Sequence, residues 1–387
     1  MPRLIPLALA LALALLSPWA LAQTYSQCNP LNNQCPANTA LGKSINVDFR
    51  KGAVNSFSAS GSPSYGSDGV SFTVAKGGDA PQLNSIFYIM YGRVDVTLRA
   101  APGPGIVSSV VLESDDLDEI DLEWLGANPD EVQSNYFGKG RTTTYNRGRF
   151  HRLDATQTRL VTYTIDWTHD RIVWMSSADP KPLRTLLRAD ATDAGVDEYP
   201  QTPMRVKFGA WAGGDAAHNA PGTVEWARGP TDYQRGPFSM LVESIRITDY
   251  STGSEYRYAD NSGSSDSIQA VGGAVNANYN SRSALSVTAA PEPSLPTPTG
   301  LAAALAYVPR GGIGHDDNPP PTRTQTGWPW VAGAAPTGGS IPSGWYMTSE
   351  GKIMRSSASV AACHLACSSF LLALSTAAGL AVLLCSL

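Results

Sequence analysis

Hydrophobic and polar residues alternate along short segments throughout residues 23–262. A strand has a side-chain period of two, so this alternation buries one face of each segment and exposes the other. The segments are rich in β-branched and aromatic residues, and turn-forming residues separate them at intervals of about 8–12 residues, as in sandwiches. Examples are Val70–Ala75, Ser85–Met90, Arg93–Arg99, Ile106–Leu112, Thr158–Trp167, Arg171–Met175, Met204–Gly209 and Met240–Tyr250. With no long helical period in this block, the pattern predicts a single all-β sandwich domain.

One of these alternating segments carries three acidic residues. Glu119, Asp121 and Glu123 are separated by Ile120 and Leu122, so a strand here would project all three carboxylates from one face. Like charges on one face of a sheet are destabilising, and each neighbour raises the pKa of the next. Glycoside hydrolysis uses such an arrangement, in which one carboxylate is ionised and a second carboxyl is protonated. The spacing therefore indicates catalysis of glycosidic bond cleavage.

The reach of these side chains predicts the shape of the sheet. In a flat strand the Cα atoms of Glu119 and Glu123 would be about 13 Å apart, at ~3.3 Å per residue. Carboxyl groups lie about 5–5.5 Å apart in retaining glycosidases and about 6.5–9.5 Å apart in inverting ones. Only a curved sheet brings the two groups close enough, which predicts a curved β-jelly-roll sandwich with a concave substrate groove.

Two other interpretations of the acidic segment remain open. It could be a solvated acidic edge strand, or a calcium loop, because Asp115, Asp116 and Asp118 resemble a cluster of Ca²⁺ ligands. The cluster lacks the glycine and the distal glutamate of an EF-hand loop. We therefore assign no metal site and expect no cofactor.

Both ends of the chain resemble processing signals. Arg3, an apolar run (Leu4–Leu16) and the small-residue site Ala20–Ala22 predict a secretory signal peptide over residues 1–22. At the other end, small residues at 356–359 precede an uncharged apolar tail, Phe370–Leu387. This order predicts a GPI-attachment signal over residues 356–387 that is removed, and the alternative is an uncleaved tail anchor.

The cysteine count agrees with removal of the tail. Five cysteines leave one unpaired in a secreted protein. Loss of the tail deletes three of them and leaves Cys28 and Cys35, which would close a small turn-rich loop by a disulfide.

Composition defines the remaining segments and the partners. Residues 23–262 form the predicted catalytic domain, and residues 263–355, rich in glycine, serine and proline, are predicted to be a disordered linker. The net charge of −5 and the 16% of charged residues indicate no basic surface for nucleic acid. We expect a monomer that is secreted and held at the plasma membrane or cell wall only through the GPI anchor.

The motifs together resemble glycoside hydrolase family 16, and within it the Crh group of fungal cell-wall chitin–glucan transglycosylases. The segments that carry the resemblance are Cys28–Leu31, Ser114–Asp121, Glu119–Glu123, Gln133–Gly140, Thr142–Gly148 and Phe208–Gly214. The resemblance implies a β-jelly roll and a retaining double displacement, with Glu119 as nucleophile, Asp121 as its helper and Glu123 as acid and base. Leu122 departs from the tryptophan of many relatives, and we expect only a change in packing from it.

Transfer to a sugar requires aromatic platforms and polar partners that bring the acceptor to the glycosyl-enzyme before water. Trp211 and Trp226 flank a glycine-rich loop and are the first platform candidates, while Phe137 is predicted to lie in the core. His218 is interpreted either as a sugar ligand or as an exposed loop residue. The full set of predicted substrate-binding residues is Gln133, Asn135, Tyr136, Arg141, Tyr145, Asn146, Trp211, Trp226, Tyr233 and His218.

The sequence thus favours an enzyme that cleaves chitin and transfers it to β-glucan or to chitin-oligosaccharide acceptors. A hydrolase, either an endo-β-glucanase or a chitinase, would use the same carboxylates with water as acceptor. A lectin-like wall-binding protein is a third hypothesis, although it gives no reason for three crowded carboxylates.

Overall fold

The computed structural model describes residues 26–142, 144–193, 195–280 and 283–287, together with the backbone of two short strands further along the chain. The predicted signal peptide and GPI-attachment signal lie outside the described residues.

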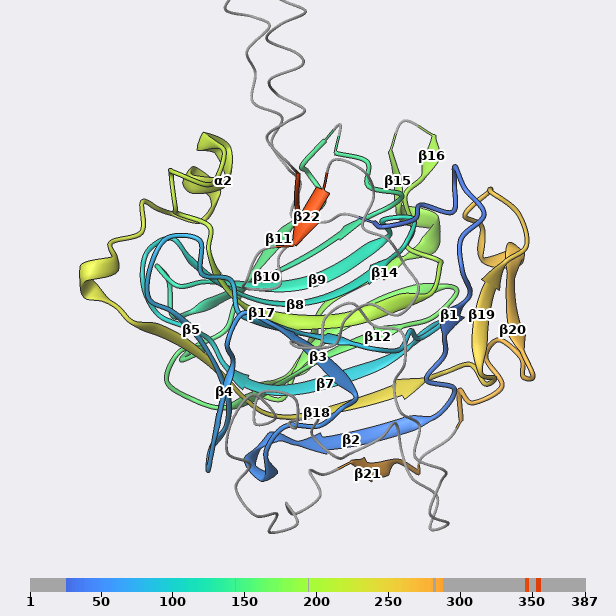
Figure 1. Cartoon of the computed structure of the whole chain (residues 1–387), viewed down its shortest axis with the longest axis horizontal. Coiled ribbons are helices and arrows are strands. Elements are labelled where there is room, and N and C mark those ends of the chain that lie inside the picture. Colours follow the sequence, from blue (N-terminus) through green and yellow to red (C-terminus); the bar gives the residue numbers. More distant parts are fainter. Residues whose placement is uncertain are drawn as a thin grey trace, which may run out of the picture. The chain divides into compact units, whose positions relative to one another are not determined.

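A seven-stranded sheet carries the acidic segment, and its strands curve along their length (Figure 1). All of its neighbouring strands are antiparallel. In spatial order the strands are β11 (Arg149–Arg152), β10 (Glu131–Phe137), β9 (Glu119–Leu125), β8 (Ile106–Ser114), β17 (Met204–Ala212), β6 (Gln82–Ser85) and β3 (Phe57–Ser60).

A nine-stranded sheet forms the second layer. Its main path is β14 (Asp179–Leu187), β13 (Arg171–Ser176), β12 (Val161–Trp167), β7 (Gly92–Arg99), β18 (Phe238–Asp249), β2 (Ser44–Asp48) and β21 (Leu285–Val287). β5 (Gly69–Val74) pairs with β18, and β4 (Ser64–Gly66) pairs with β5. β21 runs parallel to β2, whereas the other strands of this sheet pair antiparallel.

Smaller elements decorate these sheets. β1 (Asn38–Thr39), β19 (Glu255–Tyr258) and β20 (Ile268–Val271) form a three-stranded sheet, and β15 (Thr192–Asp193) pairs with β16 (Val196–Asp197). The helical turns are η1 (Phe49–Lys51), η2 (Arg188–Asp190), α2 (Pro221–Trp226), η3 (Tyr233–Arg235) and η4 (Ser265–Ser267). In a separate unit of the chain, β22 (Trp345–Met347) pairs antiparallel with β23 (Ile353–Arg355). Among the residues described, no helix has the length and apolar character needed to cross a membrane.

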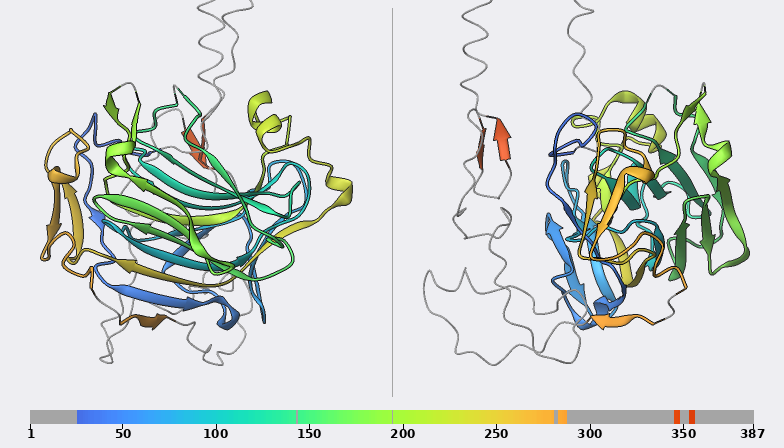
Figure 2. Two further views of the ribbon diagram at one scale, coloured as in Figure 1. Left: turned by 180° about the vertical axis from the view of Figure 1, so that it is seen from behind. Right: turned by 90° about the vertical axis from the view of Figure 1, so that its right-hand side faces the viewer.

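The core lies between the two large sheets, whose stacking is seen in Figure 2. Trp124 of β9 packs edge-on against Tyr163 of β12, with ring centroids 4.6 Å apart. The indole N–H of Trp174 on β13 donates a hydrogen bond of 3.1 Å to the backbone carbonyl of Asp121 on β9. These contacts join the back of β9 to the second sheet, so the position of the acidic strand is fixed by buried aromatic packing.

The folded domain extends beyond residue 262, the boundary predicted from the sequence. β20 pairs with β19, and β21 pairs with β2, so the chain still contributes strands as far as Val287. The predicted boundary was too early because these strands are only three or four residues long and lie in a segment rich in small residues. Such short strands carry too few alternations to be recognised without their partners.

Candidate active site

The three acidic residues of β9 lie on one face of the seven-stranded sheet, which we call the carboxylate face. Ile120 and Leu122, which alternate with them, are 0% exposed in the core. Asp121 is almost completely buried, whereas Glu119 and Glu123 are half-buried. The period of two predicted from the sequence is therefore the arrangement that the fold adopts.

The three carboxyl groups influence each other's protonation. Burial is the largest cause in each case and raises the pKa of all three, that of Glu123 to about 8. Repulsion adds to this: Asp121 and Glu113 raise the pKa of Glu119, and Glu119 raises the pKa of Glu123. A side-chain hydrogen bond joins Glu119 to Asp121, so one of the two holds a proton. The trio titrates as a coupled set and does not ionise fully at neutral pH.

β10 places two of the predicted substrate-binding residues next to this trio. Gln133 is opposite Glu123 and Asn135 is opposite Asp121 in the strand register. A Cβ atom at Gly148 would lie only 2.9 Å from the side-chain nitrogen of Gln133. The missing side chain at Gly148 therefore leaves room for the Gln133 amide.

Two tryptophans stand at the same side of the carboxylate face. The indole N–H of Trp226 in α2 donates a hydrogen bond of 3.1 Å to the Gln133 side-chain oxygen. Trp211 and Trp226 stack with centroids 6.1 Å apart and ring planes 22° apart. They pack over Val107 and Leu125, and both remain partly exposed. The structure thus connects the two favoured platform candidates, through Gln133, to the strand that borders Glu123.

The predicted roles of Tyr136 and Phe137 were reversed. Tyr136 is 5% exposed and pairs in register with Ile120, so it belongs to the core and not to the carboxylate face. Phe137 pairs with Glu119 and lies under the guanidinium of Arg147, 4.8 Å from its ring centroid. Side chains on one face of a strand are two residues apart. Because Gln133 and Asn135 lie on the carboxylate face, Phe137 lies there too, and Tyr136 lies on the opposite face, toward the core.

The loop after β10 carries three more of the predicted residues. The Arg141 guanidinium donates to the backbone carbonyl of Asp197 (2.9 Å) and to the side chain of Glu198 (3.0 Å). Tyr145 is 78% exposed, and the Asn146 carbonyl accepts a hydrogen bond of 2.8 Å from a neighbouring arginine. The contacts described for these residues do not include the three carboxylates, so their substrate-binding role stays a prediction.

His218 and Tyr233 meet at a different acidic residue, Asp215. The Nδ1 atom of His218 lies 2.7 Å from the Asp215 carboxylate, and the imidazole is 61% exposed. Burial, followed by a hydrogen bond to Asp215, raises the pKa of Tyr233 to about 12. The structure therefore brings these two predicted residues together in one hydrogen-bonded group, in which the exposed-loop interpretation of His218 also holds.

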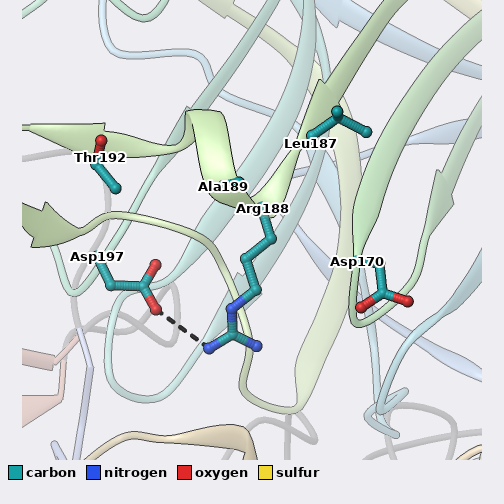
Figure 3. Close-up of a pocket in the computed structure, with 6 residues that line it drawn as sticks. All are labelled: Asp170, Leu187, Arg188, Ala189, Thr192 and Asp197. Atoms are coloured by element: carbon teal, nitrogen blue, oxygen red, sulfur yellow. Dashed lines mark hydrogen bonds and ion pairs between the residues drawn. The ribbon is translucent and has the colours of Figure 1, made fainter.

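Two cavities open elsewhere on the domain. Figure 3 shows the larger, of about 580 Å³, in which the Arg188 guanidinium points to the Asp197 carboxylate, 3.1 Å away. Its lining consists of Asp170, Leu187, Arg188, Ala189, Thr192 and Asp197. The smaller cavity, of about 390 Å³, includes Tyr136 and Asn146 in its lining. Neither cavity is lined by Glu119, Asp121 or Glu123. The candidate active site is therefore the carboxylate face and not one of these two cavities.

The acidic cluster before β9 is neutralised by a lysine. Asp116 and Asp118 are 0% exposed, and the Lys139 ammonium lies 3.0 and 2.7 Å from them. The Thr202 hydroxyl also contacts both, at 2.6 and 2.8 Å. The positive charge next to Asp116 and Asp118 is thus the Lys139 ammonium, at the place where the sequence suggested a calcium ion. Among the residues described, no group of three or more potential metal-binding side chains occurs.

The predicted disulfide is present. Cys28 and Cys35 are bonded, with their Cα atoms 5.7 Å apart. The loop of eight residues that they close lies just before β1.

Comparison with known proteins decides the family. The chain is 55% identical to Crh-like protein 4 of Botryotinia fuckeliana over 348 residues. The matched region covers 87% of each of the two chains. The model of glycosyl hydrolases family 16 matches residues 50–228. The chain belongs to glycosyl hydrolase family 16.

Other relatives of this family 16 enzyme carry Crh names. Crh-like protein 4 of Aspergillus fumigatus is 46% identical over 90% of this chain and 76% of its own. The solved structure of a Crh5 transglycosylase in complex with NAG superposes with a TM-score of 0.60 at 47% identity, over 63% of this chain and 99% of that one. These similarities confirm the predicted family, the Crh group within it, the β-sandwich fold and the enzyme class, a glycosidase or transglycosylase.

Sequence reasoning missed three residues on the carboxylate face of this family 16 enzyme. Phe137 could have been found by continuing the period of two from Gln133. Glu113 and Lys207 come from β8 and β17, and they reach the site only because those strands pair beside β9. Glu113 faces Glu119 across the hairpin of β8 and β9, a pairing between segments that follow each other in the chain. No local pattern indicates the position of Lys207, because β8 and β17 are segments about 90 residues apart.

Proposed function

We propose that this Crh-group enzyme is a cell-wall transglycosylase that cleaves chitin and transfers the fragment to β-glucan or chitin-oligosaccharide acceptors. The observation that carries the proposal is the buried trio of carboxyls on one sheet face with an aromatic pair beside it. A solved relative agrees with this chemistry, because the Crh5 transglycosylase forms a complex with NAG.

The two outer carboxyls take the two roles that a retaining glycosidase requires. Glu119 attacks the anomeric carbon while Glu123 gives its proton to the leaving glycosidic oxygen. An acceptor hydroxyl then attacks the glycosyl-enzyme, Glu123 takes its proton and Glu119 leaves. A pKa of about 8 keeps Glu123 protonated for the first step near neutral pH.

Asp121 supports Glu119 in this scheme. It is 1% exposed, less than half-buried Glu119, and a side-chain hydrogen bond joins the two residues. For Glu119 to attack as a nucleophile, Asp121 must hold the shared proton and donate a hydrogen bond to ionised Glu119. This orients the nucleophile and spreads its charge.

The aromatic pair favours a sugar acceptor over water. Sugars stack their apolar faces on indole rings, and Trp211 and Trp226 are partly exposed. Gln133, fixed by the Trp226 N–H, and Asn135 supply hydrogen-bonding groups next to the carboxyls. A bound acceptor sugar would exclude water from the glycosyl-enzyme.

The substrates fix where such an enzyme acts. Chitin and β-glucan are insoluble wall polymers, so the enzyme must be outside the cell. This agrees with the predicted signal peptide and with a GPI anchor as the attachment to the plasma membrane or cell wall. A monomer is sufficient, because all three carboxyls come from one strand.

The test is a transfer assay with the protein expressed from its full coding sequence in a secreting host. A chitin oligosaccharide serves as donor and a fluorescently labelled β-1,3-glucan as acceptor, with products identified by mass spectrometry. Glu119→Gln removes the nucleophile. Glu255→Gln is the matched control, because Glu255 lies on β19 and pairs with exposed Arg257.

Labelled hybrid chains from the wild type and Glu255→Gln, but not from Glu119→Gln, support the proposal. Shortened, unlabelled oligosaccharides would make the enzyme a hydrolase. If neither sugar changes while both variants bind chitin equally, the lectin-like hypothesis replaces it.

A further inference from the structure

An ion pair that is not part of the proposed reaction lies beside Glu119. The Lys207 ammonium contacts the Glu113 carboxylate, and Glu113 is 5% exposed. Glu113 on β8 is directly opposite Glu119 on β9. Lys207 on β17 is opposite Val111, which is itself opposite Asp121. The pair thus belongs to the carboxylate face, within two strands of the trio.

Glu113 and Glu119 repel each other in this placement, and Lys207 offsets the repulsion. Two carboxylates opposite each other on adjacent strands repel, and burial makes the repulsion stronger. Glu113 raises the pKa of Glu119, and Lys207 lowers it. Burial also raises the pKa of Glu113, against the opposing effect of Lys207.

The other charged groups around Glu119 do not replace Lys207. β10 presents the uncharged Phe137 opposite Glu119, and the Arg147 guanidinium over that ring pairs with Glu198, 3.5 Å away. Arg205 of β17 is opposite Glu113, and its guanidinium stacks on the Tyr88 ring, 4.7 Å from the centroid. The charged groups that act on Glu119 from these strands are Asp121, Glu123, Glu113 and Lys207, while Arg205 acts on Glu113.

We infer that Lys207 is a positioning residue for the nucleophile: it pairs with buried Glu113 on the carboxylate face, offsets the repulsion of that carboxylate and keeps Glu119 ionised. The inference rests on the proposed function, since it gives Glu119 the role of nucleophile. Opposite charges within a few ångströms stabilise the ionised form of a carboxyl. The pair therefore sets the lower pH limit of the reaction.

The first experiment measures the pH profile of kcat/KM for transfer, whose acidic limb reports ionisation of the nucleophile in the free enzyme. Lys207→Met should move this limb up by about 0.5–1 pH unit, and Glu113→Gln should move it down by about as much. The double variant removes one charge of each sign and should return the limb close to that of the wild type. Lys207→Arg keeps the charge and should leave the limb in place.

A second experiment needs no turnover and separates this inference from the proposed function. Glutamate labelled with ¹³C at the carboxyl carbon is titrated by NMR in the wild type, in Lys207→Gln and in Lys207→Arg, and the Glu119 signal is identified by its loss in Glu119→Gln. A higher Glu119 pKa in Lys207→Gln, with the wild-type value kept in Lys207→Arg, supports the inference even if no substrate is turned over. Lys207→Gln keeps a polar side chain beside Glu113, so the test remains possible if Lys207→Met fails to fold.

Equal losses of kcat/KM at every pH, with the limb unmoved, would show that the pair only stabilises the fold and would overturn the inference. An unchanged Glu119 pKa in the NMR titration would have the same meaning. A Glu119 pKa that rises in Lys207→Gln, in a protein that transfers no sugar, would overturn the proposed function alone.

Discussion

A carboxyl that gives a proton to a leaving group has to remain protonated at the pH of the reaction. Glu123 meets this condition because burial, and then repulsion from Glu119, raises its pKa to about 8. The neighbour that opposes its ionisation is Glu119, the carboxylate that the proposed reaction uses as nucleophile. Two residues of one type thus acquire different roles from their surroundings.

The pH dependence follows with a definite sign. A raised pKa means that the protonated acid is present below pH 8 and is lost as pH rises through that value. We expect kcat/KM to fall about tenfold per pH unit above pH 8, as for the loss of a single proton. In Asp154→Asn, which alters a side chain 74% exposed on the surface, the limb should stay in place. A basic limb near pH 5, where ordinary carboxyls titrate, would show that Glu123 is not the acid.

At the scale of the element, β10 shows how one strand divides its side chains between two environments. Gln133, Asn135 and Phe137 lie on the carboxylate face, whereas Tyr136 packs in the core. The chemistry of tyrosine suggested a sugar platform, but the strand period decided its direction. Position in the strand, more than residue type, therefore decides whether a side chain of β10 is buried in the core.

Helix α2 carries the other platform candidate, and its contribution can be measured. Trp226→Ala should raise the acceptor KM about tenfold with a smaller effect on kcat, because the stacking surface and the hydrogen bond to Gln133 are lost. Trp226→Phe retains a ring and should lose less. Tyr136→Phe is the matched aromatic control, and a core residue at this position should leave the acceptor KM unchanged. Equal KM values in all three variants would remove Trp226 from the site.

At the scale of the whole molecule, one buried carboxylate joins several parts of the domain. Asp249, at the end of β18, is 0% exposed and accepts hydrogen bonds from the backbone N–H groups of Gly42, Met90 and Ser251. It also accepts one from the Tyr256 hydroxyl of β19, at 2.5 Å. These contacts connect the nine-stranded sheet to the three-stranded sheet and to the segments between them.

Removal of this carboxylate should destabilise the domain. Asp249→Ala leaves four donors without their partner, and we expect a loss of about 3 kcal/mol or more in the free energy of unfolding. Urea denaturation followed by tryptophan fluorescence measures it. The control is Asp154→Ala at the exposed position used above, where little change is expected. A change as small as that of the control would mean that water replaces the carboxylate.

Much of the site was predictable because local chemistry fixes it. The acidic residues two apart in β9 required a strand with one apolar face, and the cysteine count indicated the Cys28–Cys35 bond that the structure contains. The loop residues were less predictable. Arg141 binds Glu198, and His218 binds Asp215, through contacts that no sequence period encodes.

By itself, then, the sequence determined the alternation that makes β9 a strand, the family resemblance and the identity of the three carboxyls, because these depend on residues close together in the chain. Only the tertiary structure decided which carboxyl is most buried and that the domain extends to β21. It also placed Lys207 of β17 on the carboxylate face, two strands from β9. The physical reason is that burial and charge–charge distance depend on which strands pair, and pairing between distant segments is fixed by packing of the whole core.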